Sequence, residues 1–218
     1  MKCLVLFILA FIIIFYTAVE DTYAGFLTTF TVKHFHWTKA RGSFATSVFW
    51  TSFAVGRFSG IFVVNFFRQA RLLRVYSLLL ISAFVCLLST TLTHEDVGVW
   101  VSSVVAGFAM SIFFPIFFSW TEEKFFHVDG KVTALIMTSA MIGVIINPIV
   151  LGQVMGTNPE WFAYILFIES SLLFIFFSMG VCVSGVMKKY RKSVSEEKRA
   201  DLDNSMRLLQ KTEKDSEV

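Results

Sequence analysis

The hydrophobic positions of this chain fall into six long runs separated by short polar segments. A helix needs roughly 20 mostly apolar residues to cross the hydrocarbon core of a bilayer, and each run is long enough. The connections are short, so we expect consecutive helices to lie antiparallel and to pack on one another. The pattern predicts an all-α, polytopic membrane protein. The predicted spans are about residues 3–32, 43–67, 73–92, 97–120, 132–155 and 161–187.

The last 31 residues differ from the rest of the chain in their charge. Nearly half of all the Lys, Arg, Asp and Glu residues lie after Met187. Even with them the chain is 56% hydrophobic and only 16% charged, whereas a soluble domain carries roughly 25% charged residues. We therefore predict a six-helix transmembrane bundle over residues 1–187, in contact with lipid, and a charged cytoplasmic tail over 188–218.

The Lys and Arg residues in the short loops predict the orientation, because cytoplasmic loops carry an excess of them. With the N-terminus inside, one side of the membrane holds most of these residues. Both termini are therefore expected in the cytoplasm, with the plasma membrane as the expected location. The inner side would carry Lys2, Arg68, Arg71, Arg74, Lys124, Lys131, Lys188, Lys189, Arg191 and Lys192, and the outer side Lys33, Lys39 and Arg41.

The N-terminus also allows a second interpretation. Lys2 followed by an apolar stretch is typical of a signal peptide, with cleavage after Ala18 or Ala24. Against this, the apolar pattern resumes after Asp21 with helical spacing.

Composition and motifs exclude several classes of function. A net charge of +3, with basic residues at helix ends, does not favour a nucleic-acid partner. The three cysteines lie in apolar runs without a CxxC pair or a Cys/His cluster, so no metal site is predicted. The four histidines lie in predicted loops, and no Ser/His/Asp set shares a plausible site. We therefore predict neither an enzyme nor a catalytic residue. The residues concerned are Cys3, Cys86, Cys182, His34, His36, His94 and His127.

A polar face interrupts the first apolar run at Glu20 and Asp21. Ionisable side chains at membrane depth are costly, so they face a cavity, a partner or water. With helical spacing, Tyr16, Glu20 and Tyr23 share one face, and Asp21 and Thr28 share the adjacent face. Such a broad polar face suits a hydroxyl-rich ligand or a cation. The alternative is a pair of acids at the outer interface.

Two prolines lie within later runs. Pro148 has no N–H for the Val144 carbonyl, and Pro115 has none for the Ser111 carbonyl. We expect Pro148 to interrupt the fifth helix, and each freed oxygen is a candidate ligand for a cation, water or substrate. Transporters build sites from such helices, although a purely mechanical kink is the alternative. Asn147, directly before Pro148, is a further binding candidate.

Three other positions attract attention. Glu169 is a lone acid about eight residues into the sixth run, so it either couples an ion or proton or bonds a neighbouring helix. Gly56 and Gly60 form a small-xxx-small pair that permits close helix contact. Arg57 between them either pairs with a carboxylate or extends its head toward water.

Three segments carry a resemblance to a known family. They read YTAVEDTYAGFLTTFTV over residues 16–32, FWTSFAVGRFSG over 49–60 and FPIFFSWTEEKFFHVDG over 114–130. With Gly143, Pro148 and Gly152, the chain resembles the C-terminal half of a major facilitator superfamily transporter over about residues 10–185. Within it, the chain is most similar to the sodium-dependent glucose transporter-like proteins (the major facilitator superfamily domain-containing protein 4 group).

This resemblance implies a fold and a mechanism. The family has twelve helices in two six-helix halves, each of two three-helix inverted repeats, with substrate between the halves. It implies that Glu20 contacts substrate or ion, and that Arg57 and the loop at residues 68–74 belong to the cytoplasmic gating region. The usual loop signature is incomplete, because the segment after Gly60 has no Asp.

The resemblance leads to two functional hypotheses. In the first, the chain is half of a secondary transporter for a sugar or polyol such as glucose, with sodium as a candidate coupling ion and no other cofactor. Half of a cavity needs a complement, so the chain is either a fragment lacking its N-terminal half or it pairs with a second copy. In the second, it is a non-transporting six-helix scaffold or a truncated regulatory subunit.

Overall fold

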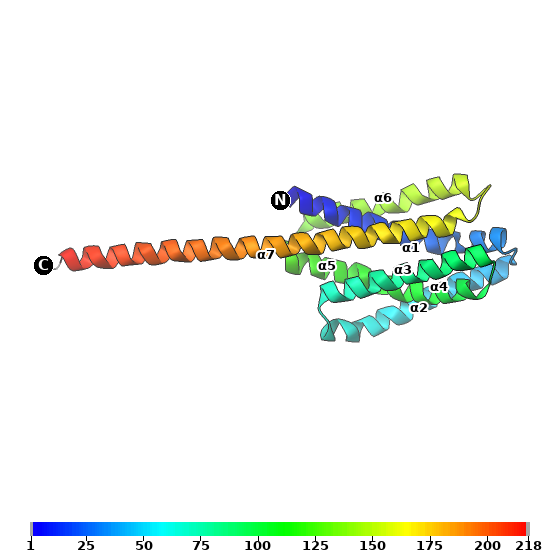
Figure 1. Ribbon diagram of the computed structural model, residues 1–218, viewed down its shortest axis with the longest axis horizontal. Coiled ribbons are helices and arrows are strands. Elements are labelled where there is room, and N and C mark those ends of the chain that lie inside the picture. The colour runs from blue at the N-terminus through cyan, green and yellow to red at the C-terminus, as the bar shows by residue number, and fades with distance from the viewer. Residues whose placement is uncertain (1, 217–218) are drawn as a thin grey trace. The chain divides into compact units, whose positions relative to one another are not determined.

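The computed structural model describes the backbone of residues 2–216 and the side chains of residues 3–190 and 199. Throughout that range the regular structure is helical, and no strand occurs in it (Figure 1). The helices are α1 (Lys2–His34), α2 (Lys39–Phe66), α3 (Gln69–Thr93), α4 (Val97–Ser111), α5 (Phe113–Lys124), α6 (Gly130–Val154) and α7 (Trp161–Ser216).

The six predicted spans are confirmed in the described residues. Six helical stretches have the length and hydropathy to cross a membrane. The fourth, Val97–Lys124, consists of α4 and α5, and the sixth is the Trp161–Tyr190 part of α7. By its internal contacts the chain divides into two units, Met1–Gly180 and Val181–Val218. The predicted start of the tail at residue 188 lies inside α7 and stays a prediction.

The helix interruption expected at Pro148 is wrong, because α6 runs unbroken through this residue. Helix α1 is continuous through Glu20 and Asp21, in agreement with the predicted span over residues 3–32. The Glu20 side chain is half-buried and the Asp21 side chain is exposed. One proline removes one backbone donor, and the turns on either side of Pro148 keep α6 helical.

The fourth span behaves differently from α6. It breaks at Ile112, whose backbone (φ −105°, ψ −1°) separates α4 from α5. Pro115 lies one turn after this break and cannot donate to the Ser111 carbonyl. Among the two proline-bearing spans of the described chain, only this one is divided.

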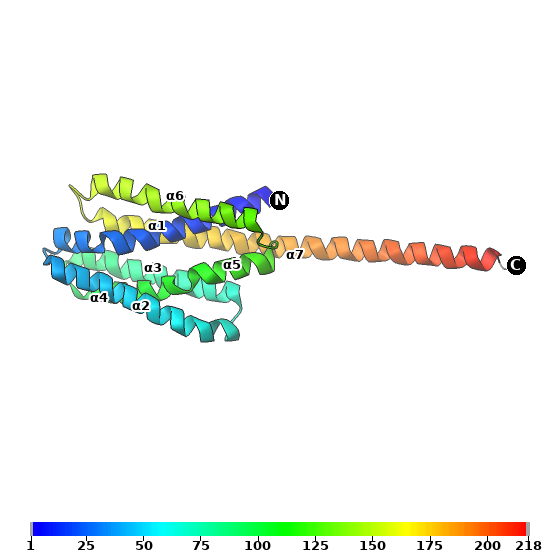
Figure 2. The same ribbon diagram turned by 180° about the vertical axis from the view of Figure 1, so that it is seen from behind.

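The two most extensive helix contacts, α2 on α4 and α1 on α6, join helices that are not consecutive (Figures 1 and 2). Consecutive helices also pack on one another, as expected, where α1 meets α2 and α3 meets α4. Glycine residues explain the two contacts that the sequence did not predict. A Cβ atom at Gly143 of α6 would clash with the Ile14 carbonyl of α1, and one at Gly107 of α4 would clash with the Phe49 carbonyl of α2. Small residues let these backbones approach closely.

Polar contacts hold the helix ends. Thr38 and Asp129 cap α2 and α6 by accepting from the N–H of the third residue that follows each of them, Arg41 and Val132, at 3.3 and 2.9 Å. The Trp37 indole donates to Asp96 at 2.9 Å, which connects the loop before α2 to the loop before α4.

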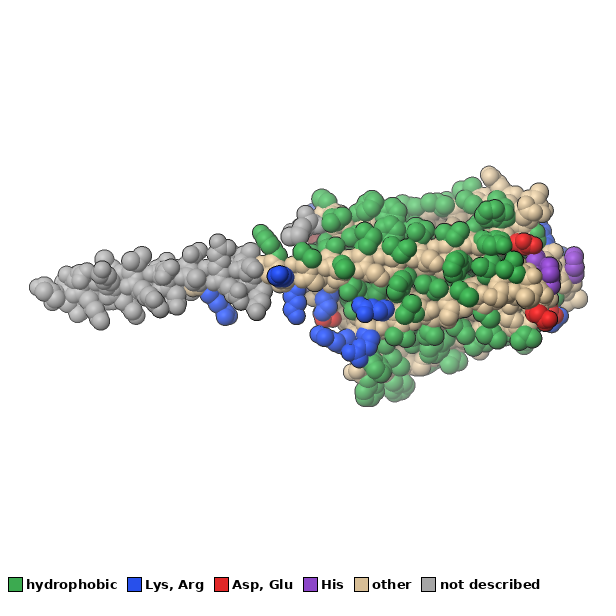
Figure 3. Space-filling model, viewed as in Figure 1, with side chains coloured by type: hydrophobic (Ala, Val, Ile, Leu, Met, Phe, Trp, Pro, Cys, Tyr) green, Lys and Arg blue, Asp and Glu red, His purple; other side chains and the backbone are tan. Residues whose placement is uncertain are grey.

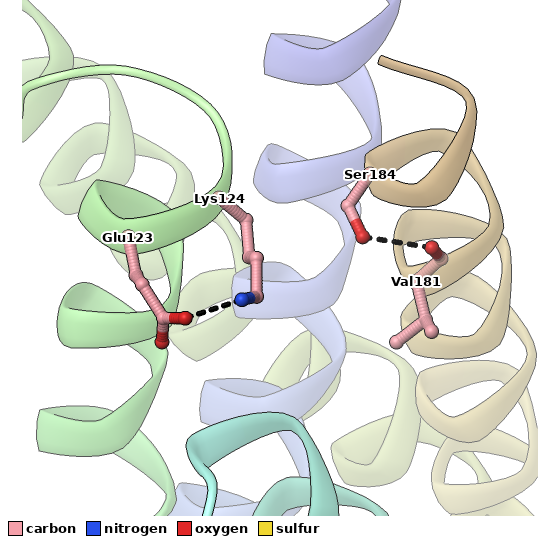
Figure 4. Close-up of polar contacts among 4 residues, drawn as sticks. All are labelled: Glu123, Lys124, Val181 and Ser184. Atoms are coloured by element: carbon pink, nitrogen blue, oxygen red, sulfur yellow. Dashed lines mark hydrogen bonds and ion pairs between the residues drawn. The ribbon is translucent and has the colours of Figure 1, made fainter. Parts of the chain in front are cut away.

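Short-range polar contacts also occur in the later helices. Lys124 and Glu123 pair at the end of α5, and the Ser184 hydroxyl donates to the Val181 carbonyl at 2.8 Å within α7 (Figure 4).

The outer surface of the bundle is apolar. Hydrophobic side chains are spread along the length of the bundle on the face shown in Figure 3. Phe58 and Phe66 of α2 are 73% and 82% exposed, and Ile145 of α6 is 60% exposed. Water does not solvate such a surface well, whereas lipid does.

Candidate functional site

The centre of the candidate site is a polar cluster inside the bundle, formed by α1, α6 and the membrane-length part of α7. The Asn147 side-chain nitrogen lies 3.2 Å from the Ala18 carbonyl, 2.7 Å from Thr22 Oγ1 and 2.9 Å from Glu169 Oε2. Asn147 is 5% exposed and Thr22 1%. We call Ala18, Thr22, Asn147 and Glu169 the Asn147 cluster. It brings together Asn147 and Glu169, two candidates that the sequence placed on different helices.

Thr22 is a member of this cluster that the sequence analysis did not select. It follows the Glu20–Asp21 pair directly and lies one turn after Ala18. A hydroxyl next to two acids in an apolar run was the available signal. Helical spacing alone could not show that Thr22 faces α6, because it does not tell which face packs on which helix.

Tyr16 and Glu20 form a second polar group on α1. The Tyr16 hydroxyl donates to the Met110 carbonyl at 3.0 Å, and its ring stacks on Phe113 at 4.8 Å between centroids. Glu20 lies one turn after Tyr16 on the same face of α1, and its side chain is half-buried. Because Tyr16 contacts Met110 and Phe113, this face of α1 lies near the break between α4 and α5.

Arg57 takes the carbonyl that Pro115 leaves without a helical donor. Its Nε atom donates to the Ser111 carbonyl at 3.3 Å, and its guanidinium lies 4.7 Å above the Phe53 ring centroid. None of the ion pairs among the described residues involves Arg57. The arginine thus finds a backbone partner rather than a carboxylate at contact distance.

Gly56 and Gly60 lie beside Arg57 and face the same break. A Cβ atom at Gly56 would clash with the Ser111 side chain, and one at Gly60 would clash with Ile112. These glycines therefore bring α2 against the break.

Tyr23 and Thr28 lie in contacts between helices. Tyr23 is fully buried, and its hydroxyl is shared with Ser102 at 3.2 Å and Ser103 at 2.9 Å. Thr28 Oγ1 lies 3.1 Å from Thr46 Oγ1 of α2. In this structure both side chains connect α1 to its neighbours, and Tyr23 exposes no surface to a ligand.

Asp21 starts an exposed polar stripe on α1. Asp21 and Thr29 are exposed, and so is Gly25 between them at helical spacing. Thr29 is a second polar residue that the sequence analysis did not select, although its spacing of eight from Asp21 was a usable signal. The stripe leaves an open polar surface on a helix that otherwise contacts protein or lipid.

A pocket of about 410 Å³ lies at the break between α4 and α5. Its size is within the usual range for small-molecule sites. Its polar groups are the Arg57 guanidinium, the Gln69 amide and the hydroxyls of Ser111 and Ser119, set among apolar side chains such as Phe114. The Gln69 Oε1 atom is buried and has no hydrogen-bond partner among the described residues. A donor on a ligand would satisfy it.

A larger pocket of about 760 Å³ lies between α2, α3 and α4, and its lining is mainly apolar. Its hydroxyls are largely used within the protein: Ser47 and Thr51 donate to carbonyls one turn earlier, and Ser52 donates to Val104. It is therefore a poorer match for a hydroxyl-rich ligand. Among the described residues, no three His, Cys, Asp or Glu side chains converge as metal ligands.

Comparisons with known proteins agree with this architecture. The family model of the Major Facilitator Superfamily matches residues 1–148. "Sodium-dependent glucose transporter 1" of Rattus norvegicus is 25% identical over 199 residues, which cover 89% of this chain and 40% of that protein. "Major facilitator superfamily domain-containing protein 4A" of Danio rerio is 25% identical over 186 residues, covering 84% of this chain and 35% of that protein.

A solved structure shows the same fold. The crystal structure of FucP, a Major Facilitator Superfamily transporter in the outward conformation, superposes with a TM-score of 0.68 at 19% identity and covers 81% of this chain and 42% of that one. The chain thus spans about two fifths of the length of the relatives it matches. Since the family model covers more than half of its residues, the chain belongs to the Major Facilitator Superfamily, whose members are transporters and not enzymes.

Proposed function

We propose that the chain is one six-helix half of a secondary active transporter that takes up a sugar or similar polyol, with sodium as the coupling ion. The observation that carries this proposal is the set of polar groups enclosed by apolar helices. Glu20, Asn147 and Glu169 lie inside or along a bundle whose exterior suits lipid, and such groups in membrane helices mark substrate and ion pathways. The printed names of the relatives support glucose and sodium.

The pocket at the break between α4 and α5 supports a hydroxyl-rich substrate. Gln69 and Ser119 offer an amide and a hydroxyl, and the Phe114 ring offers an apolar face for the carbon skeleton. Arg57 and Gln69 line this pocket. The structure places residues 69–74, which were expected to form a loop, in the first turns of α3. We propose that Arg57 and residues 68–74 belong to a cytoplasmic gate.

A complement is required for transport. One half cannot enclose a substrate by itself, and the chain matches only 40% of the rat relative. We propose that the complement is an N-terminal six-helix half, with a second copy of this chain as the alternative. The excess of Lys and Arg in alternate loops supports cytoplasmic termini, and the plasma membrane is the proposed location.

The first test is to sequence the gene upstream of Met1. Six further hydrophobic stretches in frame would support a twelve-helix transporter. Cells expressing the resulting full-length protein are then expected to take up labelled glucose faster with an inward sodium gradient than with choline in its place. Absence of uptake for every hexose tried would refute the sugar assignment.

The second test separates transport from a scaffolding role. In the full-length protein, Glu20→Gln is expected to reduce uptake at unchanged surface expression, because Glu20 is the half-buried acid beside Tyr16. Glu123→Gln, at an exposed position of α5, is the matched control and should leave uptake unchanged. Equal uptake by both variants would favour the scaffold.

A further inference from the structure

We propose that the Asn147 cluster is a binding site for a monovalent cation, sodium, and that the Asn147 amide occupies the position of the ion in this structure. The inference rests on the proposed function, because it assigns a place to the proposed coupling ion. The site would take the ion on oxygen atoms of α1, α6 and α7.

The geometry is the first argument. Three oxygens surround one nitrogen: the Ala18 carbonyl at 3.2 Å, Thr22 Oγ1 at 2.7 Å and Glu169 Oε2 at 2.9 Å. An amide nitrogen carries two hydrogens, so it cannot give each of the three acceptors a hydrogen of its own. A cation has no such limit, since it attracts all surrounding oxygens at once. The arrangement is therefore better matched to an ion than to the amide that fills it.

The charge balance is the second argument. Glu169 is the one carboxylate of the cluster, and none of the ion pairs among the described residues includes it. A carboxylate at this depth is costly without a compensating charge. One carboxylate matches one positive charge, whereas Ca²⁺ sites use several charged or bidentate carboxylates and Mg²⁺ keeps several waters. The ligands are all hard oxygens, which exclude the softer transition metals.

The side chain of Asn147 supplies a way to exchange the amide for the ion. Rotation of its amide group would withdraw the NH₂ from the three oxygens and present the carbonyl oxygen as a fourth ligand. The Val144 carbonyl, one turn before Pro148 on α6, lacks its usual helical donor because proline has no N–H. In both arrangements the cluster connects α1, α6 and α7, but only the ion-bound one places a positive charge beside Glu169.

The experiment measures binding without transport. The purified 218-residue chain in lipid nanodiscs is titrated with ²²Na⁺, and bound radioactivity is counted by scintillation proximity. We expect saturable binding that unlabelled Na⁺ displaces and choline does not. Glu169→Gln keeps the size of the side chain and removes its charge, so it is expected to abolish measurable binding. Thr22→Val replaces the hydroxyl ligand with a methyl group of similar size. It is expected to weaken binding about tenfold or more.

Two variants control for folding. Thr22→Ser keeps the hydroxyl and removes the methyl group, and it should bind sodium as the unaltered chain does. This result would show that the hydroxyl, and not the packing of the methyl group, supports binding. Glu123→Gln removes an exposed carboxylate of α5 and should also leave binding unchanged. Absence of saturable ²²Na⁺ binding to the monodisperse, helical chain would overturn the proposal, and so would undiminished binding by Glu169→Gln.

Uptake by the full-length protein distinguishes this site from the proposed function. Sodium-driven uptake that survives Glu169→Gln would place the coupling ion elsewhere and leave the proposed function intact. Retained ²²Na⁺ binding without any hexose uptake would do the reverse: the cation site would stand and the sugar assignment would fail.

Discussion

At the scale of single residues, several polar side chains bond to backbone carbonyls of a neighbouring helix. Tyr16 donates to Met110, Thr17 donates to Ala140 at 3.0 Å, and Ser52 donates to Val104 at 2.6 Å. Most of these carbonyls already accept a hydrogen bond within their own helix and use their second lone pair. Such bonds connect helices without requiring a matching polar residue opposite.

Removal of the Tyr16 hydroxyl would measure how much one such hydrogen bond contributes to stability. Tyr16→Phe keeps the stacking on Phe113 and removes the donor to Met110. We expect a loss of about 0.5–1.5 kcal/mol in the free energy of unfolding, the range for single buried hydrogen bonds in membrane helices. Unfolding of the purified chain in mixed micelles measures it. Tyr190→Phe, at an exposed position, should be neutral, and an equal loss in both variants would contradict the assignment.

Arg57 and Pro115 are expected to depend on each other. Arg57→Met removes the donor to the Ser111 carbonyl and should cost about 1.5–3 kcal/mol, as for hydrogen bonds from charged groups. In a Pro115→Ala background the helix supplies its own donor to that carbonyl, so Arg57→Met should cost less there. A double-mutant cycle on the unfolding free energy measures the difference. Simple additivity of the two changes would contradict this account.

At the scale of helices, close contact between backbones decides which helices pair. The Gly143 Cα faces the Ile14 carbonyl of α1, while Gly152, nine residues later on the same helix, has open space at its Cβ position. Gly143 and Gly152 therefore form a matched pair for a test of packing.

Alanine at these two positions should have opposite effects. Gly143→Ala pushes α6 away from α1 and is expected to destabilise the chain by about 1–3 kcal/mol. Gly152→Ala meets no neighbour and should stabilise it slightly, because alanine favours a helix by about 1 kcal/mol over glycine. Thermal unfolding of both variants in one detergent gives the comparison. A stabilising Gly143→Ala would show that the α1–α6 contact is looser than described.

The sequence predicted the existence of all six spans, because length and hydropathy determine a membrane helix almost alone. It did not predict the pairs α1–α6 and α2–α4, since glycines allow close approach on any side and do not identify the partner. The prolines show the same limit: Pro115 lies next to a helix break and Pro148 does not.

The candidate site was predictable in part for a related reason. Asn147 and Glu169 stand out because they are polar in apolar runs, and the structure brings them to 2.9 Å from each other. Tyr23 stood out equally, yet it lies in the buried contact with Ser102 and Ser103. Polarity in a span identifies a residue that needs a partner, but the partner can be another helix rather than a ligand.

At the scale of the whole molecule, the two ends of the bundle differ in charge, which leads to a topology prediction. Glu95 lies in the loop after α3, and Asp129 lies in the loop before α6, at the opposite end in the proposed orientation. In a chain with its three cysteines replaced by serine, a membrane-impermeant maleimide should label Glu95→Cys in intact cells. Asp129→Cys should react only after permeabilisation, and the reverse pattern would invert the proposed orientation.

The break at Ile112 has a consequence for how this chain can diverge from its relatives. Arg57 of α2 donates to the Ser111 carbonyl, which Pro115 of α5 leaves without a helical donor. A relative that replaces Pro115 with a residue carrying an N–H no longer needs a cation at position 57, and one that loses Arg57 first retains an unsatisfied carbonyl until the proline is also lost. The two positions are therefore expected to change together among related sequences.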